Sequence, residues 1–94
     1  MLKKTIMYKI HIESLYEMMY RKNITTIVEL SEAMHKVQPK TKASTFKIYI
    51  YSGDRKKYLS EKEMQNYIAV SMMVAKVLCD TLDCDIDDLG GKRI

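Results

Sequence analysis

The sequence predicts a mainly α-helical protein, a small helical bundle that forms a single domain over residues 1–94. A chain of 94 residues has the usual size of one domain and can bury one modest hydrophobic core. With 47% hydrophobic and 30% charged residues, the composition is that of a folded protein and not of a disordered chain. Only three Gly and one Pro are too few turn residues for a many-stranded β-sandwich.

The N-terminal third predicts a strand followed by two short helices. Apolar and polar residues alternate over residues 5–12, which allows a half-buried N-terminal strand. The apolar spacing becomes helical over residues 13–22. Thr26 and Glu29 have the spacing of a capping box, which predicts a second helix over residues 26–35. Because so few residues separate the two helices, they are expected to form an angled pair.

The segment Ser44 to Ser52 fits two structures. Alternation of apolar and polar residues predicts a short β element at residues 45–51, and its aromatic and β-branched residues favour a strand. Phe46 and Ile50 also stand at helical spacing. The residues of this segment alone leave both structures open.

A long helix is predicted from Ser60 to about Asp83. Ser60 and Glu63 have the spacing of a second capping box. The helix would be apolar on nearly all sides, so it must be buried centrally or shared with a partner. We therefore expect a homodimer, with an interface formed by the apolar residues Tyr67, Val70, Val74 and Val77.

The C-terminal segment predicts one last helical turn. Asp85 can cap residues 86–89, and Gly90 can end the turn. Cys79 and Cys84 are five residues apart, outside the usual spacing of a zinc pair. We expect them to be reduced packing residues, with no metal and no other cofactor bound.

The sequence contains no clear pattern of catalytic residues and no segment long enough to span a membrane. His11 and His35 lie in different segments, without a Ser, Cys or carboxylate at the spacing of a dyad or triad, so we expect no enzyme. The longest apolar run, Tyr67 to Ala75, is far shorter than the ~20 residues of a membrane span. Without a signal-peptide pattern at the N-terminus, a cytoplasmic protein is expected.

Charge is distributed unevenly along the chain. Residues 1–60 carry twelve Lys or Arg and five acidic residues, whereas residues 61–94 carry four and seven. The most basic block, residues 36–57, has a net charge of +6, with Asp54 as its one acid. Such a block is typical of phosphate contact, because each neutralised phosphate releases counterions. Its cations are Lys36, Lys40, Lys42, Lys47, Arg55, Lys56 and Lys57.

Two parts of the chain resemble a known family. The segment Leu78 to Leu89, with its Leu-Cys, Leu82, Cys84 and Asp88-Leu89, resembles the closing helix and final turn of Cro/repressor-type helix-turn-helix domains, the XRE family. Upstream, the segments Leu15 to Met19, Asn23 to Thr25 and Val28 to Ser31 are similar to the family's first helix, turn and second helix.

The resemblance covers about residues 8–35 and 74–89, and it implies a sequence-specific, duplex-DNA-binding transcriptional regulator. Such a regulator, a small phage- or plasmid-type repressor, places its third helix in the major groove. That helix would be the segment Thr45 to Gly53, although the preceding connection is longer than usual and contains Pro39. Phosphates would be bound by Thr25, Thr26, Lys36, Lys40, Arg55, Lys56 and Lys57. Base edges would be contacted by Gln38, Thr41, Lys42, Ser44, Thr45 and Lys47.

Two alternatives remain at this point. The order of a strand followed by two helices is also that of ribbon-helix-helix dimers, in which Lys9 and His11 of the strand would enter the groove. A protein-binding adaptor or inhibitor on a helix-turn-helix-like scaffold would instead use the Met- and Tyr-rich surface, with the basic block against an acidic protein partner.

Overall fold

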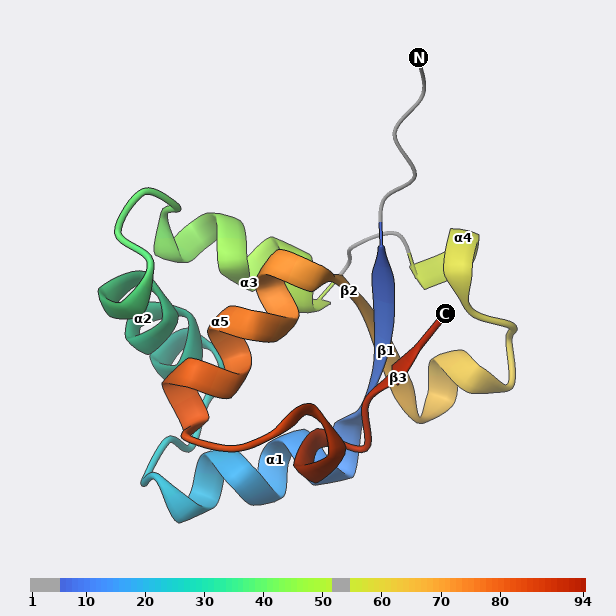
Figure 1. The fold of residues 1–94 in the computed structure, drawn as a ribbon, viewed down its shortest axis with the longest axis horizontal. Helices are drawn as coiled ribbons and strands as arrows, with labels where there is room; N and C mark the ends of the chain where they lie inside the picture. Colours follow the sequence, from blue (N-terminus) through green and yellow to red (C-terminus); the bar gives the residue numbers. More distant parts are fainter. Residues whose placement is uncertain (1–5, 52–54) are drawn as a thin grey trace.

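The computed structural model describes residues 6–51 and 55–94 and confirms a mainly α-helical fold with a small β component (Figure 1). Thr5, Ser52, Gly53 and Asp54, which entered the sequence predictions, lie outside these residues. None of the helices in the described ranges is long and apolar enough to cross a membrane. In chain order the elements are β1 (Met7–His11), α1 (Ile12–Arg21), α2 (Ile27–Val37), α3 (Ala43–Tyr51), α4 (Arg55–Tyr58), η1 (Glu63–Gln65), β2 (Tyr67–Ser71), α5 (Met72–Leu82), η2 (Ile86–Leu89) and β3 (Lys92–Arg93).

The predicted N-terminal strand is confirmed as β1, the central strand of an antiparallel sheet with the order β2-β1-β3. Its five residues pair with β2 from Met7 opposite Ser71 to His11 opposite Tyr67. On the other side, Tyr8 lies opposite Arg93 of the short β3. The sheet therefore brings the start, the middle and the end of the chain together.

The long helix predicted from Ser60 to Asp83 is wrong. The Ser60–Glu63 capping box forms, with hydrogen bonds of 3.2 and 3.1 Å between each side chain and the other's backbone N–H. It opens only the short 3-10 turn η1, after which the chain becomes β2. Pairing with β2 satisfies backbone groups of the central strand β1, which a helix could not do. Helix α5 starts anew at Ser71, whose hydroxyl accepts a hydrogen bond from the Val74 N–H at 3.4 Å.

The short β element predicted at residues 45–51 is also wrong, because this segment is helix α3. Phe46 and Ile50 are 0% and 3% exposed, and their spacing of four residues puts them on one face of the helix. The packing of this face against α2 outweighs the strand preference of the individual residues.

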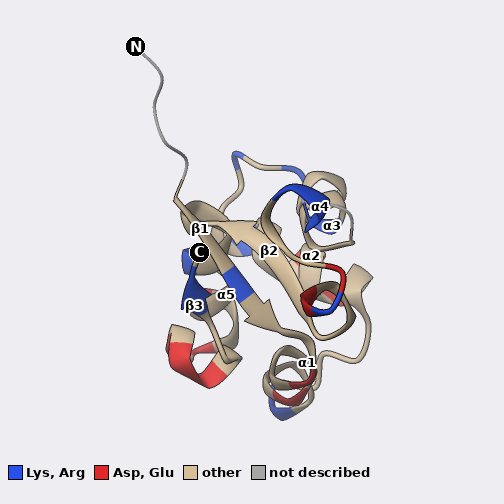
Figure 2. Ribbon diagram, turned by 90° about the vertical axis from the view of Figure 1, so that its right-hand side faces the viewer, with Lys and Arg blue, Asp and Glu red and all other residues tan. Residues whose placement is uncertain are grey.

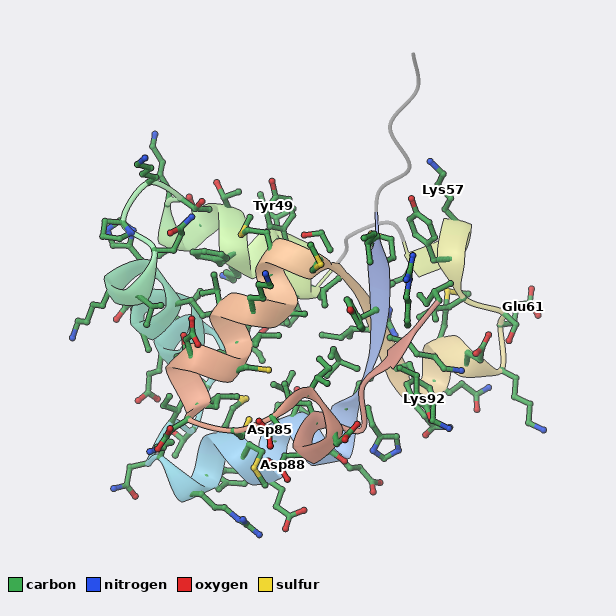
Figure 3. All side chains as sticks on the ribbon, viewed as in Figure 1. Tyr49, Lys57, Glu61, Asp85, Asp88 and Lys92 are labelled. Atoms are coloured by element: carbon green, nitrogen blue, oxygen red, sulfur yellow. The ribbon has the colours of Figure 1, made fainter. Side chains whose placement is uncertain are left out.

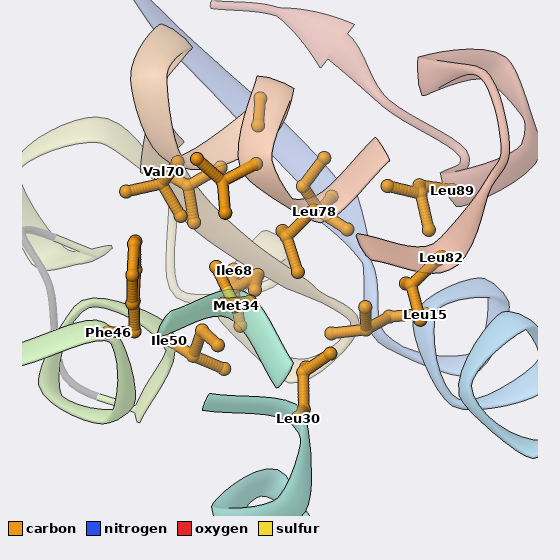
Figure 4. Packing of buried hydrophobic residues seen from close by; sticks show 14 of the residues in the cluster. Leu15, Leu30, Met34, Phe46, Ile50, Ile68, Val70, Leu78, Leu82 and Leu89 are labelled. Atoms are coloured by element: carbon orange, nitrogen blue, oxygen red, sulfur yellow. The ribbon is translucent and has the colours of Figure 1, made fainter. Parts of the chain in front are cut away.

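One hydrophobic cluster joins the helices to the sheet (Figure 4). It contains Phe46 together with Val70, Val74 and Val77, three of the four residues expected at a dimer interface. These three valines are 2%, 1% and 6% exposed in the single chain. A partner was expected because these apolar residues needed to be covered. The core of the single chain already covers the three valines, so they do not call for a dimer.

The predicted C-terminal turn is confirmed as η2. The backbone N–H of Asp85 donates to the Asp88 carboxylate at 3.0 Å, and Gly90 ends the turn with a φ of 60°. A Cβ atom at Gly90 would lie only 2.7 Å from the Cβ of His11, so the turn needs glycine here both for space and for its backbone conformation. Cys79 and Cys84 are partly buried against the core, as packing residues would be.

Candidate nucleic-acid interface

Helices α2 and α3 form an angled pair joined by residues 38–42, and backbone hydrogen bonds order this connection. The N–H of Gln38 donates to Met34 O at 2.9 Å, and the N–H of Thr41 donates to Gln38 O at 3.2 Å. His35 Nδ1 lies 2.7 Å from Thr41 O, and since a carbonyl oxygen only accepts, the ring donates this bond. The connection is longer than a minimal helix-turn-helix turn, yet it is held to the end of α2.

Helix α3 presents an outward face that is partly apolar. Ile48 is two residues from both buried anchors, Phe46 and Ile50, so it lies about 200° around the helix from each. Its side chain is 59% exposed, and that of Tyr51 is 54% exposed. We define the outward stripe of α3 as four exposed residues spaced three or four apart, which are Ser44, Lys47, Ile48 and Tyr51. Tyr49, also exposed, lies on the same helix (Figure 3).

Four exposed lysines lie on α3 and on the segments that precede it in the chain. Lys36, Lys40 and Lys42 are exposed at the end of α2 and in the connection, and Lys47 is exposed on α3 itself. The sequence from Ala33 to Gly53 contains no Asp or Glu. In Figure 2 the acidic turn η2 lies at the bottom, whereas the basic positions of the α2–α3 connection lie toward the top. The region therefore has a positive potential that suits a phosphate backbone.

The other basic residues are on α4, whose first residue, Arg55, lines one pocket together with Ile50 and Tyr51 at the end of α3. Helix α4 lies across the sheet from the α2–α3 pair (Figure 1). The Arg55 guanidinium donates to the backbone oxygens of Met64 and Tyr67, the latter at 3.0 Å. Arg55 thus links α4 to η1 and the start of β2, and its expected contact with phosphate stays a prediction. Lys56 and Lys57 are exposed, and their expected phosphate contacts stay predictions as well.

The two hydroxyls predicted to donate to phosphate already have an acceptor. Thr25 Oγ1 donates to the Glu29 carboxylate at 2.7 Å, and Thr26 Oγ1 donates to it at 3.1 Å. These bonds lower the pKa of Glu29, so the N-terminus of α2 carries an ionised carboxylate. Thr26 does accept a hydrogen bond from the Glu29 N–H at 3.1 Å, which confirms it as the helix cap. A phosphate role for Thr25 and Thr26 is not supported by this arrangement.

The predicted base-contacting residues are brought together along the connection and the first half of α3. Lys42, Ser44 and Lys47 are exposed, whereas the other three, Gln38, Thr41 and Thr45, are half-buried. The sequence predictions missed Ile48, Tyr51 and His35. The first two could have been found by assuming a helix anchored by Phe46 and Ile50 and asking which residues lie opposite.

The alternative of a ribbon-helix-helix dimer is wrong for this chain. Such a dimer pairs its strand with a second copy, but β1 is already the central strand of a sheet formed within one chain. Lys9 Nζ lies 2.7 Å from Glu63 Oε2 and 4.9 Å from the centre of the Tyr67 ring. The hydrogen bond from Lys9 is the main reason that the pKa of Glu63 falls to about 2. Lys9 therefore has a structural role inside the fold.

Comparison of the chain with protein-family models, with curated proteins and with solved structures gives no match. An assignment of function therefore depends on the geometry and charge of the α2–α3 region.

Proposed function

We propose that the protein is a sequence-specific, duplex-DNA-binding transcriptional regulator that inserts α3 into the major groove. The observation that carries this proposal is the outward stripe of α3, exposed along one face of a helix whose opposite face is anchored by Phe46 and Ile50. An α-helix with its side chains is about 10–12 Å wide, which matches the major groove of about 12 Å. Acting on duplex DNA, a small repressor of this kind would work in the cytoplasm.

The cations suit two different roles. Lys36 at the end of α2 and Lys40 in the connection are exposed and would neutralise phosphates, which sets the position of the protein on the duplex. Lys42 directly precedes α3, and Lys47 lies within it. From these positions an ammonium group can reach the O6 and N7 acceptors of guanine. Lys56 and Lys57 of α4 would meet phosphates outside the segment that α3 contacts.

A homodimer on a palindromic site belongs to the proposal because two-fold symmetry would double the groove contacts. The valines Val70, Val74 and Val77 cannot form its interface without leaving the core. The dimer would have to use another surface, and sedimentation with and without DNA would report its presence.

Salt-dependent binding to duplex DNA tests the proposal. We expect affinity for random duplex to fall steeply between about 50 and 200 mM salt, with about one unit of log–log slope for each phosphate contact. The double variant Lys36→Ala with Lys40→Ala should reduce the slope by about two. The matched control is Lys92→Ala, at an exposed lysine of β3 far from the α2–α3 connection (Figure 3).

A protein-binding adaptor is the second candidate, and the exposed apolar residues of α3 favour it. Ile48, Tyr49 and Tyr51 could pack against an acidic protein partner as well as against DNA. The same titration separates the two functions. Absence of duplex binding at the lowest salt, or an affinity that does not depend on salt, would contradict the DNA-binding proposal.

A further inference from the structure

We propose that Ile48 recognises the 5-methyl group of thymine, so that the preferred duplex carries thymine at the centre of the α3 contact. This inference rests on the proposed function, since it requires α3 to lie in the major groove. It goes further by naming the base and the chemical group that the helix selects.

The position of Ile48 on α3 supports this assignment. Ile48 lies opposite the buried anchors Phe46 and Ile50, so it points most directly away from the core. It is also near the middle of the nine-residue helix Ala43–Tyr51. A helix that lies along the major groove turns its outward face to the base edges, so Ile48 would face them.

The side chain of isoleucine restricts what it can recognise. The edges of G, C and A in the major groove present hydrogen-bonding acceptors and donors, and thymine adds an apolar methyl group. A branched alkyl group against the polar edges would leave those groups without water and without a partner, which is unfavourable. Against the thymine methyl, the same alkyl group removes apolar surface from water on both sides.

Neighbouring residues favour DNA as the occupant of this face. Lys47 precedes Ile48 and is exposed, and its Nζ lies 6.0 Å from the centre of the Tyr51 ring. The face combines an ammonium group with two apolar side chains, and no acidic residue occurs from Ala33 to Gly53, so it complements a polyanion that carries methyl groups. Double-stranded RNA fits poorly, because its major groove is deep and narrow and uracil lacks the methyl group.

Replacement of thymine by deoxyuridine tests the inference directly. A preferred duplex is first selected from a random pool, and each thymine of the selected site is then replaced singly by deoxyuridine. The exchange keeps the base pair and removes only the 5-methyl group. At one or two positions we expect the Kd to rise about three- to fivefold, the effect of losing one methyl contact.

A variant then assigns the effect to one side chain. The Ile48→Ala variant should bind the thymine duplex more weakly than the native protein does. Its Kd should be the same for the thymine duplex and for the duplex with deoxyuridine at that position. Met73→Ala, at an exposed apolar residue of α5, is the matched control and should keep the full difference. Because Ile48 is exposed, the variant should keep its native melting temperature, which a thermal scan checks.

The outcomes separate this inference from the proposed function. Duplex binding with a preferred sequence but with no effect of deoxyuridine at any position overturns the inference and leaves the proposed function in place. Duplex binding with no preferred sequence overturns the inference and also the sequence-specific part of the proposed function. If the Ile48→Ala variant keeps the native difference in Kd between the thymine and deoxyuridine duplexes, another residue makes the methyl contact. That result also overturns the inference. Failure to bind any duplex DNA overturns the proposed function itself.

Discussion

Helix α3 and strand β2 are two segments in which local pattern and final structure disagree, in opposite directions. Residues 45–51 have the alternation and the β-branched and aromatic content of a strand, yet they are helical. Residues 67–71 belong to an apolar stretch at helical spacing, yet they form β2. Both segments are short and mostly apolar, so their composition does not distinguish them.

The difference lies in what each segment packs against. The backbone of β2 pairs with the whole length of β1, and this pairing satisfies hydrogen-bonding groups in the interior of the protein. Among the described residues no strand pairs with residues 45–51, and Phe46 and Ile50 pack beside α2 instead. Tertiary partners therefore decide the structure of both segments. They also leave one face of α3 exposed to solvent, whereas the three central residues of β2 are all buried.

The largest expected effect comes from a charge in β2. Val70→Asp would place a carboxylate among apolar side chains at a site that is 2% exposed. It should lower the free energy of unfolding by more than about 4 kcal/mol and leave little folded protein. Urea unfolding followed by circular dichroism measures the loss, with Met73→Asp at an exposed position as the control. A folded monomer of native stability would show that Val70 belongs to a subunit interface after all.

A smaller loss is expected at the inner face of α3. Phe46→Ala removes a ring that is fully buried and should destabilise the fold by about 3–5 kcal/mol. Ile48→Ala on the outer face of the same helix should change the free energy of unfolding by less than about 0.5 kcal/mol. Equal losses for the two variants in thermal unfolding would mean that the outer face is also packed.

The smallest effect concerns the ion pair that joins β1 to η1. Because the pKa of Glu63 is about 2 in the folded protein and 4.5 in the unfolded chain, its carboxylate stabilises the fold above about pH 4.5. This contribution is lost as the pH falls from about 4.5 to about 2. Glu63→Gln should therefore be less stable than the native protein at pH 6, and the two should converge near pH 2. A constant difference across this range in urea midpoints would contradict the role of the pair.

The parts of the fold that could be predicted from the sequence are those specified by short-range signals. The Thr26 cap starts α2 one residue later, at Ile27, and Asp85 caps η2 with Gly90 at its end. The Ser60–Glu63 box was recognised correctly, but the length of the helix that follows it depends on a strand more than fifty residues upstream. Local spacing contains no information about that pairing.

The candidate site was predictable only in part for the same reason. Charge alone indicated the lysines from Lys36 to Lys47, because the charge of a side chain can be read from the sequence without the fold. It also included Arg55, whose hydrogen bonds to backbone oxygens depend on how α4 meets β2. Ile48 was missed because its exposure follows from the helical structure of α3, which the sequence left open.

The most direct test of the central claim is a titration of the isotopically labelled protein with duplex DNA, followed by NMR of its backbone amides. We expect the largest chemical-shift changes from Lys36 to Tyr51, which cover the end of α2, the connection and α3. Amides of α1 and η2 should change little. Changes centred on β1, α5 or η2, with α3 unaffected, would contradict the assignment of α3 as the helix that binds DNA.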